Sequence, residues 1–309
     1  MSDLIEVASG LAFPEGPIAM PDGSVVLVEM FGPRLTRVHP DGTKETIAEI
    51  PGGPNGAALG PDGKFYICNN GGRFTETDMD GLTFPGPLTR SNYIGGRIQV
   101  VDPDTGKVED LYTECDGRPL LAPNDLVFDA HGGFYFTDHG LVDEEERIHR
   151  LSGIYYAKAD GSSIKEVVFP CDDPNGIGLS PDGTKLYWAE TWRGRLLQRD
   201  IIAPGEVSVP SIVDTSQCLY GFPGLQLLDS LAVDSAGNVC VATIVNGGVS
   251  VVSPQGELVE FVPTGDLITT NICFGGEDLR TAYITLSTTG RLVKMTWPRP
   301  GLALEYLNK

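Results

Sequence analysis

The 309-residue sequence predicts an all-β protein, a six-bladed β-propeller with a central channel, and three observations support this fold class. Glycine and proline are frequent, with 39 and 23 residues, and no stretch longer than the 13 residues of 277–289 lacks both. Long helices need such stretches, because an interior proline costs about 3 kcal/mol and an interior glycine about 1 kcal/mol. No apolar segment approaches the roughly 20 residues of a membrane-spanning helix. The third observation is an internal repeat.

The repeat consists of a turn, usually with aspartate and glycine, followed by an alternating strand, and it recurs at intervals of roughly 40 to 70 residues. The six copies begin at Pro21, Pro61, Asp129, Pro181, Asp234 and, more loosely, Gly275. An apolar strand precedes each copy, and two further strands follow most of them, as in GRIQVVDPDTG with KVEDLYTE. Six units of four short strands are typical of a six-bladed propeller. We expect one domain over residues 1–309, closed by a strand from residues 3–8 or 302–307.

The net charge limits the classes of molecule that this protein is expected to bind. The chain has 22 lysines and arginines against 42 aspartates and glutamates, a formal net charge of −20. Such acidity argues against nucleic acids and anionic membrane surfaces as partners and favours a small-molecule substrate. The six cysteines are scattered without the spacing of a zinc site or a disulfide scaffold, and the N-terminus carries no signal-peptide pattern. A cytoplasmic location with reduced thiols is therefore expected.

A polar residue opens the first strand of every repeat. These six residues are Glu15, Asn55, Asn124, Asn175, Asp229 and Asn271. In a propeller the first strand of each blade lines the channel, so all six should surround one channel mouth. Six oxygen-bearing side chains without a lysine or arginine favour a hard cation. The alternative is that asparagine and aspartate before glycine simply form turns.

These motifs, from FPEGP through PND and PNG to the last repeat, resemble the senescence-marker-protein/gluconolactonase (regucalcin-like) family of metal-dependent lactonases. The resemblance implies one divalent metal at the channel mouth. Its ligands would be Glu15, Asn124, Asn175 and Asp229, although the last motif here reads Leu-Asp-Ser. Asn55 and Asn271 match less strictly assigned positions and would hold water or substrate.

The ligand chemistry agrees with Ca²⁺, which takes six to eight oxygens, so four protein ligands leave positions for water and substrate. Zn²⁺, Mn²⁺, Mg²⁺ and Fe²⁺ stay open as alternatives. The expected reaction is the opening of a lactone, or a related cyclic or activated ester, to the hydroxy acid. The metal would polarise the carbonyl, and Asp229 or a metal-bound hydroxide would supply the base or nucleophile, which makes Asp229 and Asn124 the candidate catalytic residues.

Two long connections should lie above the metal, residues 69–96 and 138–153. The first carries Phe74 and Phe84, which favour a less polar substrate, and the second is predicted to hold a short helix from its charge spacing. His139 and Trp192, just beyond their strands, are candidate substrate-contacting residues. In the sugar-lactone-hydrolysing relatives an arginine precedes the asparagine of the N-D pair by two residues, where this chain has Ala122.

Two other function classes stay open on the sequence. A phosphotriesterase could use the same cation to polarise a P=O bond, and organophosphate turnover would distinguish it. A non-enzymatic or metal-free propeller of the strictosidine-synthase type would bind no metal. The carboxylates of Glu15 and Asp229 argue against the last class.

Overall fold

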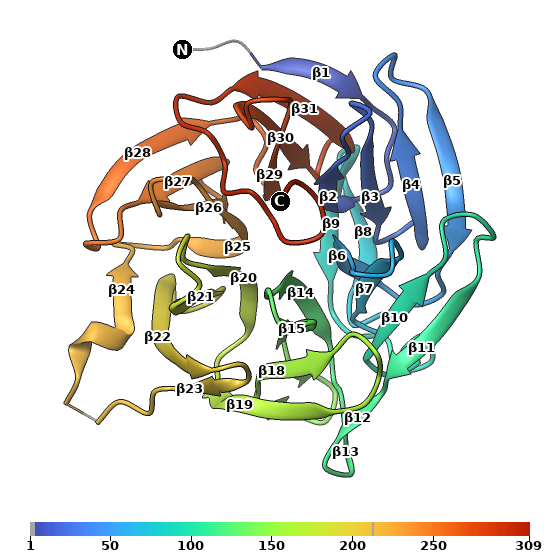
Figure 1. Cartoon of the computed structure of the whole chain (residues 1–309). Coiled ribbons are helices and arrows are strands. Elements are labelled where there is room, and N and C mark those ends of the chain that lie inside the picture. The colour runs from blue at the N-terminus through green and yellow to red at the C-terminus, as the bar shows by residue number, and fades with distance from the viewer. Residues whose placement is uncertain (1–3, 212) are drawn as a thin grey trace.

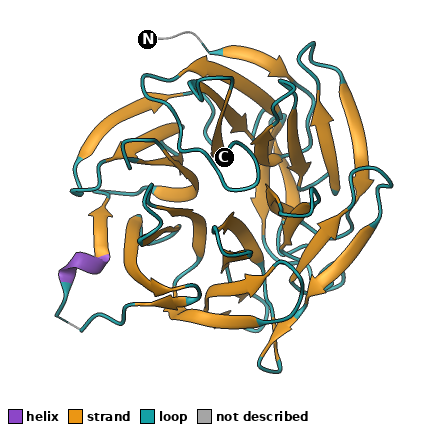
Figure 2. Cartoon of the chain, viewed as in Figure 1, coloured by secondary structure: helices purple, strands orange, loops and turns teal. Residues whose placement is uncertain are grey.

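A computed structural model describes residues 4–211 and 213–309 and confirms the six-bladed β-propeller. The six blades surround a central axis, with the first described strand at the rim and the C-terminus near the axis (Figure 1). Strands dominate the structure, with one 3-10 turn, η1 (Thr215–Gln217), on the rim (Figure 2). Among the described residues, no helix has the length and apolar character that membrane crossing requires.

The first three blades each contain four antiparallel strands, counted outward from the axis. Blade 1 consists of β2 (Pro14–Ala19), β3 (Val25–Glu29), β4 (Arg34–Val38) and β5 (Lys44–Glu49). Blade 2 consists of β6 (Pro54–Leu59), β7 (Phe65–Asn69), β10 (Arg97–Val101) and β11 (Val108–Tyr112). Blade 3 consists of β14 (Pro123–Phe128), β15 (Gly133–Asp138), β18 (Ser152–Lys158) and β19 (Ile164–Cys171).

The other three blades repeat this order with two variations. Blade 4 consists of β20 (Pro174–Leu179), β21 (Lys185–Glu190) and β22 (Arg195–Ala203), and both β23 (Glu206–Val207) and β24 (Cys218–Gly221) pair with β22. Blade 5 consists of β25 (Leu227–Val233), β26 (Val239–Ile244), β27 (Gly248–Val252) and β28 (Leu258–Pro263). Blade 6 consists of β29 (Thr269–Gly275), β30 (Thr281–Leu286), β31 (Arg291–Thr296) and β1 (Ile5–Ala8).

The N-terminal strand closes the ring. β1 pairs antiparallel with β31, with Ile5 opposite Lys294, so the predicted closure falls on the first of the two expected segments. It covers an edge of blade 6 that would otherwise present unpaired backbone groups. Apolar side chains fill the space between neighbouring blades; Val26 and Val28 of blade 1, for example, pack with Phe65 and Ile67 of blade 2. The blades are therefore held by burial of apolar surface between sheets.

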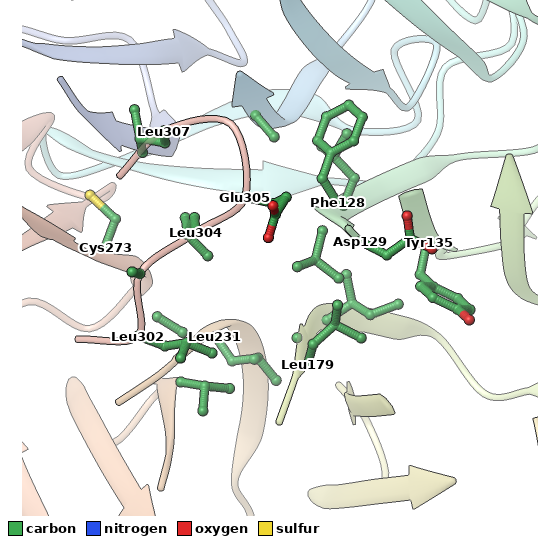
Figure 3. A pocket seen from close by; sticks show the side chains of 18 of the residues that line it. Phe128, Asp129, Tyr135, Leu179, Leu231, Cys273, Leu302, Leu304, Glu305 and Leu307 are labelled. Carbon is green, nitrogen blue, oxygen red and sulfur yellow. The ribbon is translucent and has the colours of Figure 1, made fainter. Parts of the chain in front are cut away.

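The C-terminal segment, residues 302–309, crosses the channel at the end opposite the polar ring. The backbone N–H of Leu302 donates to Val233 O on blade 5, and the Tyr306 ring lies 5.5 Å from that of Phe128 on blade 3. Leu307 packs against the apolar cluster between blades 1 and 2. Between this segment and the inner strands lies a mainly apolar cavity of about 320 Å³ (Figure 3). The segment thus covers the channel rather than forming a strand.

Candidate metal centre at the channel mouth

The six innermost strands form a closed ring in which each touches the next, in the order β2, β6, β14, β20, β25 and β29. The six polar residues predicted for the channel mouth lie at the starts of these strands. All six are buried, with exposed fractions of 2% for Glu15, 5% for Asn55, 3% for Asn124, 4% for Asn175, 6% for Asp229 and 5% for Asn271. The repeat therefore places six polar side chains at one end of the channel and buries each of them.

A register shift occurs in every inner strand at the position of its polar residue. The pairing of β2 with β3 shifts between Glu15 and Ile18, and that of β6 with β7 shifts between Pro54 and Ala57. β14, β20 and β25 shift across their polar residues, and β29 shifts just before Asn271. A bulge takes a residue out of the regular alternation and re-aims its side chain. Such an irregularity therefore recurs beside all six opening residues at this end of the channel.

The glycines of the E-G and N-G motifs lie within strands and allow neighbouring blades to approach each other. A Cβ on Gly56 would lie 2.5 Å from Asn124 O and 2.7 Å from Asp125 Cα. A Cβ on Gly176 would lie 2.5 Å from Leu231 N. Such distances to backbone atoms leave no room for a side chain. The interpretation of these motifs as simple turns is therefore wrong, because the glycines serve blade packing at the mouth.

Replacing Gly56 with alanine is expected to destabilise the protein by about 2 kcal/mol or more, since overpacking against backbone forces the two blades apart. Gly221 provides the matched control, because it has a negative φ and a Cβ added there meets no atom within 4 Å. Urea unfolding of both variants measures the difference. A Gly56→Ala protein as stable as Gly221→Ala would contradict the close approach.

Three carboxyl groups gather around this mouth. Burial raises the pKa of Glu15 well above its ordinary value, and repulsion from Asp229 and Asp125 adds to the shift. Burial likewise raises the pKa of Asp229 to about 7, and repulsion from Asp125 contributes. Burial also raises the pKa of Asp125 to about 7. Within residues 4–211 and 213–309 none of the three forms an ion pair, so the mouth carries uncompensated acidity that a cation would relieve.

Hydrogen bonds fix one oxygen of each candidate carboxylate ligand. Gly16 N and Asn271 Nδ2 both donate to Glu15 Oε2, at 3.1 and 3.3 Å. Ser230 N donates to Asp229 Oδ1 at 3.1 Å. Asn271 therefore acts on Glu15 directly, as a residue that positions a ligand would.

The asparagines leave oxygen atoms available. Asn55 Oδ1 and Asn124 Oδ1 are buried and accept no hydrogen bond from the described residues. The Asn55 amide donates instead to Met30 Sδ at 3.7 Å, and Asn175 Nδ2 donates to Thr191 Oγ1 at 3.2 Å. Buried acceptors without donors are costly, and a cation satisfies them. Two carboxylates with neutral amide oxygens fit a hard divalent cation such as Ca²⁺.

The two long connections form hairpins over this end of the channel. In the first connection, β8 (Thr75–Met79) pairs with β9 (Leu82–Gly86). In the second, β16 (Leu141–Asp143) pairs with β17 (Ile148–Arg150), so the predicted short helix is wrong. Cross-strand pairing of Leu141 with Arg150 outweighs the i,i+4 charge pairs that favoured a helix. A third short hairpin, β12 (Glu114–Cys115) with β13 (Arg118–Pro119), follows blade 2.

The substrate-contacting candidates differ in their surroundings. His139 is buried, with its ring 5.9 Å from that of Phe74 and its Nε2 3.8 Å from Asp173 Oδ1. Trp192 is 62% exposed, so it does not pack in the core. Phe74 and Phe84 pack around Phe13, Met30 and Ile268, which gives the loops above the ring an apolar cluster.

Three residues near the mouth were not selected from the sequence. Asp125 is the aspartate of the N-D pair, so the motif that identified Asn124 could also have identified it. Arg73 and Asp173 are buried charged residues in connections between strands, outside the repeated position. Asp173 lies with His149 and Asp172 in a group whose potential ligand atoms are within 4.8 Å of one another, and Asp172 also pairs with Arg193.

Comparison with known proteins identifies a matching family profile and related proteins. The profile described as SMP-30/Gluconolactonase/LRE-like region matches residues 13–288. A gluconolactonase of Zymomonas mobilis is 26% identical over 306 residues, covering 91% of this chain and 78% of that protein. A lactonase drp35 of Staphylococcus saprophyticus is 28% identical over 236 residues, covering 76% of this chain but 64% of that protein.

The solved structures agree on the fold. The crystal structure of regucalcin from Agrobacterium tumefaciens, described as a calcium-binding protein, superposes with a TM-score of 0.74 at 17% identity, covering all of this chain and 97% of that chain. At this identity the similarity concerns the fold alone. The profile, by contrast, spans all six inner strands, from Phe13 before β2 to Thr288 after β30. The chain therefore belongs to the SMP-30/gluconolactonase/LRE-like family.

Proposed function

We propose that this protein is a divalent-metal-dependent lactonase that opens a cyclic ester to the hydroxy acid. The observation that carries the proposal is a group of buried carboxyls and amide oxygens at one channel mouth. Among the described residues these carboxyls form no ion pair, and Asn55 Oδ1 and Asn124 Oδ1 meet no donor. Gluconolactonase and lactonase relatives support the same reaction class. Glu15, Asn124, Asn175 and Asp229 would hold the metal, with Ca²⁺ as the ion that their oxygens suit best.

When bound, a divalent cation supplies Lewis acidity that polarises the carbonyl and offsets the negative charge developing on its oxygen. The residues of the chain do the remaining work. Asp229 takes the proton of the water that attacks the carbonyl carbon, and the Ser230 N–H holds this carboxylate in place. The ester C–O bond then breaks, and the same proton passes to the departing ring oxygen. Asn124, whose Oδ1 has no donor among the described residues, faces the reaction from blade 3.

Glu15 has a different part in this proposal. Its Oε2 is occupied by Gly16 N and Asn271 Nδ2, which leaves Oε1 for the cation. A carboxylate held in this way is a fixed ligand and a poor proton carrier, which separates its role from that of Asp229. The burial of both carboxyls keeps bulk water from the site, so the charges there act at low dielectric.

A pH-indicator screen tests the proposal. Five- and six-membered lactones, including aldonolactones, are offered to the protein before and after treatment with chelator and after return of Ca²⁺, Mn²⁺, Mg²⁺ or Zn²⁺. We expect lactone opening that falls about 100-fold or more with chelator and returns with metal. An organophosphate triester is included as a comparison. Faster triester than lactone turnover would identify a phosphotriesterase, and turnover indifferent to chelator would reject the metal.

A further inference from the structure

Arg73 is a buried cation that forms no ion pair with the described residues. It lies in the connection after β7, over the mouth, and only 7% of its surface is exposed. Its Nε has no hydrogen-bond partner, and within residues 4–211 and 213–309 its guanidinium forms neither a hydrogen bond nor an ion pair. Burial lowers the pKa of Arg73, because it disfavours the charged form.

The Arg73 Nε–H is buried and meets no acceptor among the described residues, and a buried donor without an acceptor is costly. Among the described residues, the guanidinium carbon lies 4.6 Å from the centroid of the Phe74 ring, and Asp173 and Glu144 attract its charge without forming an ion pair. The backbone around Arg73 is nevertheless fixed, since Asn70 Oδ1 accepts hydrogen bonds from both Gly72 N and Arg73 N at 3.0 Å. The side chain is therefore held at a position where the protein itself does not satisfy it.

The surroundings of Arg73 connect it to the candidate metal centre. Asn70, which holds its backbone, donates to Met30 Sδ at 3.4 Å, and Asn55 of the polar ring donates to the same sulfur. On the other side, Arg73 interacts electrostatically with Asp173, two residues before Asn175. The Oδ1 atom of Asp173 is also buried without a hydrogen-bond donor. Arg73 thus lies among polar residues that are close to two members of the ring, Asn55 and Asn175.

Arg73 is separate from the reacting carboxylate. Arg73 follows β7 of blade 2, whereas Asp229 lies on β25 of blade 5, and the inner strands of these two blades stand on opposite sides of the ring. A ligand that reaches both places must therefore have its reactive group at the ring and a second group at Arg73.

We propose that the Arg73 guanidinium binds a carboxylate on the substrate, so that the preferred substrate is a lactone bearing a carboxylate apart from the reacting ester. This inference rests on the proposed lactonase function. The planar N–H fork of arginine matches a carboxylate in two parallel hydrogen bonds. Phosphate has the same geometry, but the nearby acidic groups of Asp173 and Glu144 disfavour a dianion. The apolar cluster around Phe74 and Phe84 would cover the carbon skeleton between the two ends.

The test compares two matched probes: γ-butyrolactone that bears a carboxylate on its γ-carbon, and the same lactone with a carboxamide at that position. The variants are Arg73→Gln and Arg73→Lys. Arg90→Gln is the control, because Arg90 lies in the same connection but is exposed and paired with Asp143 and Glu146. Losing a hydrogen bond to a charged group should lower kcat/KM for the carboxylate by about 10- to 100-fold, mainly through KM. Arg73→Lys should fall between, and turnover of the carboxamide should change little.

The outcomes separate the inference from the function on which it rests. Equal losses for both probes in Arg73→Gln and Arg73→Lys, or a wild type that does not prefer the carboxylate, overturn the inference. If the wild-type protein hydrolyses neither probe but opens other lactones, titration calorimetry measures how tightly the carboxylate probe binds to wild type and to Arg73→Gln. Binding about 10-fold or more weaker in Arg73→Gln supports the site, and equal or absent binding overturns it. If no lactone of any kind is opened, the proposed function fails, while the same calorimetry still judges Arg73.

Discussion

Replacing Asp229 with asparagine is expected to lower kcat by about 100-fold or more, because the amide keeps an oxygen for the metal but cannot accept the proton of water. Asp229 is buried, and its Oδ1 accepts a hydrogen bond from Ser230 N, so the asparagine side chain fits the same space. The measurement is the steady-state rate with the best lactone of the screen, together with metal content. KM should change much less than kcat, since the base acts in the transition state.

Asp62→Asn provides the control for Asp229→Asn. Asp62 lies on the exposed turn between β6 and β7, at the end of its strand away from the ring, and should tolerate the change. A metal-loaded Asp229→Asn protein with nearly wild-type turnover would reject Asp229 as the base. If the variant loses both metal and turnover, Asp229 serves to bind the metal. A second rate measurement at saturating Ca²⁺ separates a role as base from a role as metal ligand.

Removing the metal is expected to lower the melting temperature by about 5 °C, since a ligand at 100 times its Kd stabilises the native state by about 2.7 kcal/mol. In Glu15→Gln this difference should shrink, and bound metal should fall well below one ion per chain. Without metal, the variant should melt no lower than wild type. The physical reason is that burial raises the pKa of Glu15, and a carboxyl with a raised pKa destabilises the folded state at neutral pH.

Calorimetric or fluorescence melts with and without chelator measure this effect, and elemental analysis of the purified proteins gives the metal content. Glu257→Gln, an exposed glutamate on the turn before β28, is the control and should respond to chelator as wild type does. Unchanged metal content and unchanged melting in Glu15→Gln would exclude this glutamate as a ligand.

The fold could be predicted because its signals are local and repeated. Asp182, for example, accepts hydrogen bonds from Ser180 Oγ and Thr184 N, so its turn is built from residues adjacent in sequence. The polar ring was also visible, since its members occupy one position of each repeat. The closing strand was ambiguous, because both terminal segments are short and apolar. Only the pairing of β1 with β31 distinguishes the two.

Features that depend on loop paths could not be predicted. The charge spacing of residues 143–150 is compatible with a helix, and the strand pairing that replaces it depends on how the connection folds back. The residues next to Arg73 in the sequence do not predict that its side chain is buried. Its surroundings come from Asp173, a hundred residues later, and from the folding of a long connection over the mouth. No repeated position marks such a residue.

The C-terminal segment makes the two ends of the channel different, because it covers only one of them. Leu302, Leu304 and Leu307 line one end of the cavity, which extends along the channel to Asp125 and to Asn271 of the ring (Figure 3). The segment contacts blades 5, 3 and 1 as it crosses the axis. Because the segment covers this end of the channel, we expect a substrate to approach the ring from the side of the β8–β9 and β16–β17 hairpins and the product to leave by the same side. Substrate entry and product release would then depend on the conformation of the two long connections that hold these hairpins.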